Sequence, residues 1–148
     1  MLLYRVLLSL VAPLLLYRFW RRNGDTRYAL GALPKAEHEQ IWVHAASNGE
    51  VASLKTVLFA LLKNAPQHQV LLTTNTFEAR DLVAQWEHPK IVPCLAPLDL
   101  RWALRNFLNQ AKISKAIASE NEFWPNKLLV LGRKRIPIVS LGARVSET

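Results

Sequence analysis

The chain opens with an apolar stretch and then alternates between two hydrophobic patterns. Short apolar runs rich in β-branched residues predict strands at residues 41–45, 70–74, 90–95, 113–118 and 136–141. Apolar residues repeated at three- and four-residue intervals predict helices at 50–63, 77–86, 99–111 and 125–132. Strands that alternate with helices in this way indicate an α/β domain at 41–148, with a Rossmann-like, doubly wound, mostly parallel sheet.

Two of these helices have a clear set of apolar positions. On the first helix, we expect one face to contain Val51, Leu54, Val57, Leu58, Leu61 and Leu62. The apolar residues of the third helix are Trp102, Leu104, Phe107 and Leu108. Asp99 stands where it would cap the first turn of that third helix. Cys94 falls within a predicted strand, where we expect it to be a small buried hydrophobic residue.

The N-terminal segment differs from the rest of the chain. Arg5 and Arg18 bound Val6–Tyr17, a run of twelve residues without charge. A cleaved signal peptide needs small residues at the cleavage site, and the residues after this run are bulky. A buried helix explains the leucines, but arginines interleaved with aromatic residues are typical of a membrane interface. We therefore expect a membrane-anchor helix at 1–22, a basic linker at 23–40, and interface contacts from Arg18, Trp20, Arg21 and Arg22.

Composition narrows the classes of protein further. The chain has 148 residues, of which 51% are hydrophobic, and this excludes a disordered protein. A single cysteine excludes an internal disulfide, and the four histidines have no metal-ligand spacing, so we expect no metal site. A net charge of +8 favours an anionic partner, such as a nucleic acid, an acidic lipid or a phosphorylated substrate. A nucleic acid is the least favoured, because no nucleic-acid motif is present and the basic residues cluster beside the apolar segment.

The loops that follow the strands hold the candidate site, because doubly wound sheets bind ligands outside the carboxyl ends of their strands. After the first strand, Ser47 and Glu50 have the spacing of a capping box, which stabilises a helix N-terminus. Glu50 also has the position that a general base needs, and the helix dipole favours its ionised form. Gly49 permits a tight turn or the close approach of a ligand.

The later loops are also rich in polar groups. Thr74 and Thr76 offer hydroxyl groups to a phosphate or a sugar, or else serve only the turn. Glu120 and Glu122 suit a polyhydroxylated sugar, although acidic residues also favour a helix start. Arg144 is placed to pair with a phosphate or a carboxylate, and is otherwise a surface arginine.

Five motifs, in this order, resemble the N-terminal half of the 3-deoxy-D-manno-octulosonic acid (Kdo) transferases, glycosyltransferases that modify lipid A. The motifs are His44–Glu50, Thr73–Thr76, Pro97–Leu100, Glu120–Asn126 and Ala143–Ser146. The fourth motif is the most specific of the five. Asn48 and Gly142 depart from the family's pattern, and neither departure removes a candidate catalytic group.

The resemblance implies an inverting enzyme of the two-domain GT-B fold, which transfers Kdo from CMP-Kdo to a lipid A precursor without a cofactor or a metal. It implies that Glu50 is the catalytic base. The acceptor-binding residues would be Ser47, Gly49, Thr74, Thr76, Glu120, Glu122 and Arg144. Such an enzyme works on the membrane surface, at the cytoplasmic face of the bacterial inner membrane.

The sequence ends at Thr148, soon after the Arg144 motif. We therefore expect the C-terminal donor domain, which would bind CMP-Kdo, to be absent from this chain. Two hypotheses follow. Either the chain is the acceptor-binding half of an active Kdo transferase, or it is a non-catalytic, membrane-associated remnant that binds lipid without transferring sugar.

Overall fold

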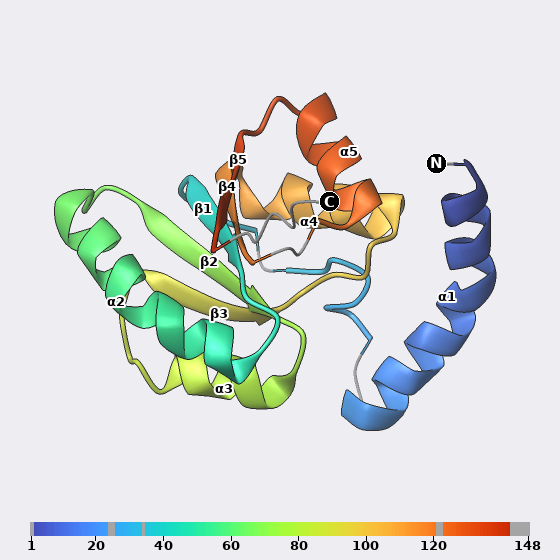
Figure 1. Cartoon of the computed structure of the whole chain (residues 1–148), viewed down its shortest axis with the longest axis horizontal. Helices are drawn as coiled ribbons and strands as arrows, with labels where there is room; N and C mark the ends of the chain where they lie inside the picture. The colour runs from blue at the N-terminus through green and yellow to red at the C-terminus, as the bar shows by residue number, and fades with distance from the viewer. Residues whose placement is uncertain (1, 24–25, 34, 121–122, 143–148) are drawn as a thin grey trace, which may run out of the picture.

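Strands and helices alternate along the chain as the sequence predicts (Figure 1). The computed structural model describes residues 2–23, 26–33, 35–120 and 123–142. Within these ranges the strands are β1 Gln40–His44, β2 Gln69–Thr74, β3 Ile91–Leu95, β4 Ile113–Ser119 and β5 Ile138–Leu141. The helices are α1 Leu2–Asn23, α2 Asn48–Asn64, α3 Phe77–Ala84, α4 Arg101–Ala111 and α5 Pro125–Arg133. Every predicted strand and helix of the α/β domain is confirmed, with ends that differ by at most two residues.

The five strands form one parallel sheet in the order β3-β2-β1-β4-β5. In the central strand β1, Val43 pairs with Leu72 of β2 on one side and with Ile117 of β4 on the other. The chain moves outward from β1 to β3 and then crosses back to β4, so the winding direction reverses between β1 and β4. Doubly wound sheets bind ligands at such a switch point. The first turn of α2, which carries Glu50, and the turn that carries Glu120 flank it.

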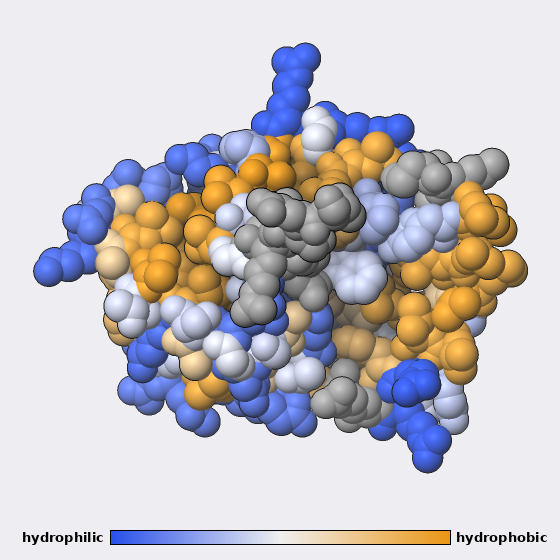
Figure 2. Space-filling model, in the orientation of Figure 1, coloured by the Kyte–Doolittle hydropathy of each residue, from blue (hydrophilic) through white to orange (hydrophobic). Residues whose placement is uncertain are grey.

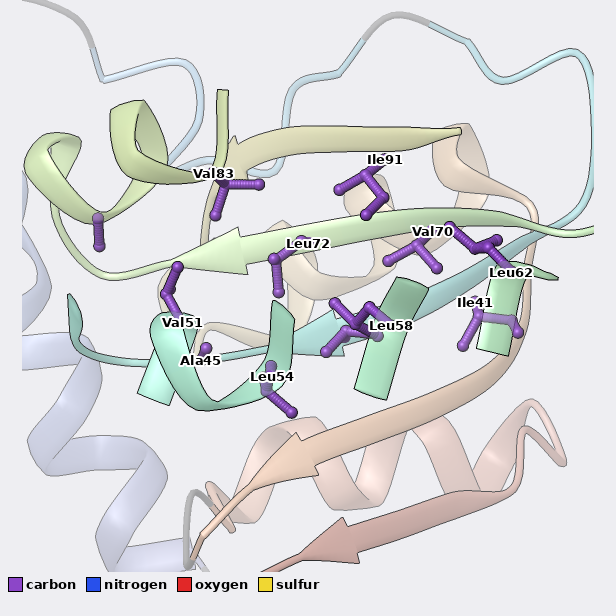
Figure 3. Close-up of a cluster of buried hydrophobic side chains, with 12 residues drawn as sticks. Ile41, Ala45, Val51, Leu54, Leu58, Leu62, Val70, Leu72, Val83 and Ile91 are labelled. Carbon is purple, nitrogen blue, oxygen red and sulfur yellow. The ribbon is translucent and has the colours of Figure 1, made fainter. Parts of the chain in front are cut away.

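A pair of helices covers each face of the sheet (Figure 1). Side chains alternate between the two faces along a strand, so neighbours in β1 enter different cores. Val43 enters the aliphatic core under α2 and α3. Figure 3 shows Leu58 and Leu72 in the same core. Trp42 enters the core under α4 and α5, where its ring centre lies 4.7 Å from that of Phe107. Both faces are therefore buried, as a parallel sheet requires.

The predicted apolar face of α2 is partly wrong, and one of the apolar residues named for α4 is exposed. Val57 is 48% exposed on α2 and Trp102 is 54% exposed on α4. At 3.6 residues per turn, Val57 lies about a quarter of a turn from the buried Leu58, and Trp102 lies about half a turn from the buried Leu104. Cys94 is buried in β3, as predicted.

Residues 26–33, which belong to the predicted linker, form turns that pack on α4. The Gln110 amide donates to the carbonyl of Gly31 at 3.2 Å and accepts from the Leu33 N–H at 3.1 Å. Gly31 has a φ of 75°, and a Cβ atom there would lie 2.1 Å from the carbonyl oxygen of Ala103. This close approach of two backbone segments requires glycine.

Helix α1 lies beside the sheet domain rather than within its layers (Figure 1). In the part of the chain that the structure describes, no helix is both long and apolar enough to cross a membrane. The helix predicted at 1–22 is thus present, but the predicted membrane-spanning anchor is not found. The uncharged run between Arg5 and Arg18 is shorter than the roughly 20 apolar residues that a span needs.

Candidate functional site

The loop after β1 begins α2 with a capping box. The Glu50 N–H donates to Ser47 Oγ at 3.4 Å, and the Ser47 hydroxyl donates to Glu50 Oε1 at 3.0 Å. Glu50 Oε2 accepts from the Ala46 N–H at 3.0 Å. The helix-capping interpretation of Ser47 and Glu50 is therefore confirmed. The half-buried Glu50 carboxylate is held in one orientation while part of it remains accessible.

The surface above this helix start is open. Gly49 is exposed in the first turn of α2. A Cβ atom at Gly49 would meet only Ser47 Oγ, at 4.0 Å. Packing therefore does not require glycine here, and a ligand has room to approach the backbone beside Glu50.

Thr74 and Thr76 stabilise the loop after β2 from within. Thr74 is fully buried, and its hydroxyl donates to the Thr76 carbonyl at 3.0 Å. Thr76 Oγ1 accepts from the Ala79 N–H at 3.2 Å and so caps α3. The turn interpretation is confirmed for both residues. Only Thr76, which is half-buried, keeps part of its side chain accessible to a ligand.

Asp99 caps a helix, although it is not the helix predicted from the sequence. Helix α4 begins after Leu100 and has no side-chain cap. The Asp99 carboxylate instead accepts from the Asn126 N–H at 3.0 Å and the Lys127 N–H at 2.7 Å, in the first turn of α5. Trp124, at the N-cap position of α5, makes no capping bond from its side chain. A carboxylate from a neighbouring loop therefore satisfies these two N–H groups.

The same carboxylate joins α1 to the sheet domain, because the Tyr4 hydroxyl donates to Asp99 Oδ2 at 2.7 Å. Burial raises the pKa of the Asp99 carboxyl above its ordinary value. The hydrogen bonds from Tyr4, Asn126 and Lys127 and the charge of Lys127 oppose this rise. Burial, and then the bond to Asp99, raises the pKa of the Tyr4 hydroxyl. Tyr4 therefore remains a neutral donor.

Glu120 lies in the turn after β4 with a φ of 53°. Such a backbone conformation is uncommon outside glycine, and two hydrogen bonds fix it here. The Glu120 N–H donates to the Leu141 carbonyl at 2.7 Å, and the Ser140 hydroxyl donates to the Glu120 carbonyl at 2.7 Å. The exposed Glu120 side chain lies at the carboxyl end of β4, beside β1. Glu122 and Arg144 lie outside the described residues.

Sequence reasoning missed a buried polar cluster beneath the strand ends. Trp42 Nε1 donates to Thr73 Oγ1 at 2.8 Å, and Nδ1 of His44 lies 3.0 Å from the same oxygen. Lys127 is only 6% exposed, and its amine lies 5.8 Å from the centre of the Trp42 ring. The sequence offers little signal for this cluster, because a lysine in the first turn of a helix usually lies at the surface.

Helix α1 has an exposed apolar surface (Figure 2). Among its large side chains, Leu3 is 72% exposed and Leu10 is 73% exposed. The predicted interface residues Arg18, Trp20 and Arg21 are also exposed, near the end of the helix that leads into the domain. The side chain of Arg22, the fourth predicted interface residue, lies outside the described part.

The fold and the loops define a doubly wound α/β domain whose polar groups gather at the switch point of its sheet. In residues 2–23, 26–33, 35–120 and 123–142, no three His, Cys, Asp or Glu side chains form a group that could hold a metal ion. The model of the 3-deoxy-D-manno-octulosonic-acid transferase (Kdo transferase) family matches residues 18–148. The chain therefore belongs to the Kdo transferase family, and the family predicted from the five motifs is confirmed.

Curated relatives agree with this assignment. The chain is 30% identical to a probable mitochondrial Kdo transferase of Arabidopsis thaliana, over 97% of this chain and 34% of the relative. It is 30% identical to the Kdo transferase of Haemophilus influenzae, over 95% of this chain and 32% of the relative. A Rickettsia typhi Kdo transferase is 30% identical over 88% of this chain and 28% of its own length. The chain thus spans about a third of the length of these relatives.

Proposed function

We propose that the chain is the acceptor-binding part of a Kdo transferase of the GT-B fold, which transfers Kdo from CMP-Kdo to a lipid A precursor in lipopolysaccharide biosynthesis. The observation that carries this proposal is the family match over residues 18–148. The position of Glu50, at the carboxyl end of the central strand, supports it. CMP-Kdo binds to a second, donor-binding domain, and the transfer takes place between the two domains.

Glu50 is the residue that we assign as the catalytic base. Each of its carboxylate oxygens accepts one hydrogen bond and keeps further acceptor capacity for a substrate hydroxyl. In the inverting step, the acceptor hydroxyl oxygen bonds to the anomeric carbon of Kdo, while the bond from that carbon to the phosphate of CMP breaks. CMP leaves with the electron pair of that bond, and the hydroxyl proton passes to Glu50. Neither a metal nor a cofactor enters this step.

The acceptor lies, in this proposal, across the loops at the switch point. The residues assigned to it are Ser47, Gly49, Thr74, Thr76, Glu120, Glu122 and Arg144. The open surface at Gly49 and the exposed carboxylate of Glu120 support this assignment. Because the Thr74 hydroxyl is buried and already bonded, its part is to position the loop that presents Thr76. Arg144 suits a phosphate of the lipid.

We also propose that α1 attaches the protein to the cytoplasmic face of the bacterial inner membrane by lying on the membrane surface. The exposed apolar side chains of α1, among them Leu3 and Leu10, support this arrangement. Arg18, Trp20, Arg21 and Arg22 would contact the headgroups. A basic residue near anionic lipid contributes about 1 kcal/mol to such attachment.

A chimera tests the proposed function. In the chimera, this chain replaces the matched region of the Haemophilus influenzae relative, and the unaltered relative is the control. The assay supplies CMP-Kdo and a lipid A precursor in detergent. Transfer of Kdo by the chimera supports the proposal. A folded chimera that transfers nothing, beside an active control, favours the alternative of a non-catalytic, lipid-binding remnant.

A further inference from the structure

A hollow of about 250 Å³ lies between α1 and the carboxyl ends of the strands. Its surface is mainly apolar, and the apolar residues that line it include Leu8, Leu15, Trp42, Pro97, Leu98 and Leu104. Because a cavity of about 150 Å³ already holds a benzene-sized molecule, this hollow has room for a longer apolar group.

The polar side chains that border the hollow are Asn75, Lys127, Tyr4, His44 and Asp99, and the last three already bond to partners within the protein. Tyr4 donates to Asp99, and the Asp99 carboxylate also accepts two N–H groups of α5. His44 contacts Thr73 at 3.0 Å. Because most of the lining is apolar and these three polar groups are already bonded, the hollow favours an apolar guest.

A second, more open hollow of about 660 Å³ adjoins the first, and both are lined by Leu15, Asn75 and Leu98. Its lining also includes Arg18 and Arg21, both exposed and three residues apart on α1. Arginine side chains pair well with phosphate groups. An apolar hollow that continues into an arginine-lined one matches a molecule with an apolar chain and an anionic head.

We propose that these two hollows bind the acceptor lipid, with one acyl chain in the apolar hollow under α1 and a phosphate at Arg18 and Arg21. The choice of the acceptor lipid as the occupant rests on the proposed function. The exposed outer surface of α1 is a different surface, which includes Leu10, and lipid would adsorb there without a defined number of sites.

Tryptophan fluorescence of the full chain tests this site, because Trp42 and Trp124 line the apolar hollow. The probe is bromoundecyl phosphate below its micelle threshold, whose bromine quenches nearby tryptophans. We expect saturable quenching at one site. Trp124→Phe should remove part of the quenching, whereas Trp102→Phe, on α4 and outside both hollows, should not. Butyl phosphate, which lacks the long chain, should compete poorly.

Two matched pairs of variants distinguish probe binding in the hollows from general probe binding to the protein surface. Leu8→Trp fills the apolar hollow and should weaken probe binding about tenfold, while Leu10→Trp on the exposed side of α1 should change it by less than about twofold. Arg18→Ser with Arg21→Ser should abolish the preference for bromoundecyl phosphate over bromoundecyl maltoside, and Arg133→Ser on α5 should preserve it. Circular dichroism checks that each variant is folded.

Equal losses in Leu8→Trp and Leu10→Trp, or quenching that never saturates, would overturn the inference. If Leu8→Trp does not fold, the comparison of Trp124→Phe with Trp102→Phe alone decides whether the probe binds in the apolar hollow. The test is independent of sugar transfer. If the probe binds but the chimera does not transfer Kdo, the proposed function is refuted and a site for an amphiphile remains. If the chimera transfers Kdo but the probe does not bind in the hollows, only the proposed site is refuted.

Discussion

Asp99 and Lys127 lie 28 residues apart in the chain and are joined by a 2.7 Å hydrogen bond from the Lys127 N–H to Asp99 Oδ1. Asp99 also accepts from the Asn126 N–H and from the hydroxyl of Tyr4. One carboxylate thus connects α1, the loop after β3 and the start of α5. Asp99 therefore fixes the start of α5, which follows the Glu120–Asn126 motif's Trp124 in the sequence.

Replacing this carboxylate should destabilise the domain. Asp99→Ala leaves two N–H groups of α5 and the Tyr4 hydroxyl without their acceptor, and we expect the free energy of unfolding to fall by about 2–3 kcal/mol. The control is Asp81→Ala, which removes only a surface ion pair with Arg80 and should cost less than about 1 kcal/mol. Urea unfolding of both variants measures the difference. Equal costs would show that Asp99 does not act as a cap.

The raised pKa of Asp99 predicts a pH dependence of stability. Between the ordinary value of 3.8 and the higher folded value, the folded chain holds more protons at Asp99 than the unfolded chain does. The contribution of Asp99 to the free energy of unfolding therefore falls as the pH rises through that window. Above the window this contribution no longer changes with pH. Asp99→Asn has no such group. In urea unfolding, the wild type should lose stability relative to Asp99→Asn as the pH rises above the ordinary value of 3.8 and through the higher folded value. A relative gain by the wild type over that range would contradict this prediction.

The capping box at Glu50 offers a matched pair of serines. Ser47→Ala removes both the cap and the donor to Glu50 Oε1, and should lower the free energy of unfolding by about 1 kcal/mol. Ser53 lies in the same helix, is exposed and bonds only to the Glu50 carbonyl, so Ser53→Ala should cost less than about 0.5 kcal/mol. Thermal unfolding compares the two variants. A larger loss from Ser53→Ala would contradict the cap.

Two glycines with nearly equal φ angles make it possible to distinguish the cost of backbone strain from the cost of steric overlap. Gly31 and Gly142 have φ values of 75° and 74°, but of these two only a Cβ atom at Gly31 would meet other atoms of the described residues within 4 Å. Gly142→Ala should therefore cost roughly 1–2 kcal/mol through backbone strain alone. Gly31→Ala should cost a further 1–3 kcal/mol, roughly, from overlap with α4. Similar costs, measured by urea unfolding, would show that residues 26–33 do not pack on α4.

The features that the sequence predicts well are those with a local cause. The strands follow from short β-branched runs, and the capping box is readable because Ser47 and Glu50 are three residues apart. The parallel order of the strands then brings the start of α2, with Glu50, and the turn of Glu120 to the same switch point. This part of the candidate site therefore follows from the hydrophobic pattern of the sequence and from the rules for doubly wound sheets.

The features that the sequence did not predict depend on distant partners. Asp99 precedes α4 in the chain, and nothing local reveals that it caps α5 instead. The burial of Lys127 against Trp42 depends on packing between α5 and β1. Val57 and Trp102 are exposed because of their angular positions around their helices. On each helix, the buried residues cover a narrower arc than the apolar residues of the sequence do.

The rate of Kdo transfer by the Glu50→Gln form of the chimera tests the central claim most directly. Glu78→Gln is the control, because Glu78 also lies in the first turn of a helix, α3. If Glu50 is the base, Glu50→Gln lowers kcat by about 10²–10⁴-fold, with little change in KM for the acceptor, and Glu78→Gln leaves the rate unchanged. If Glu50→Gln transfers Kdo as fast as Glu78→Gln, Glu50 is not the base.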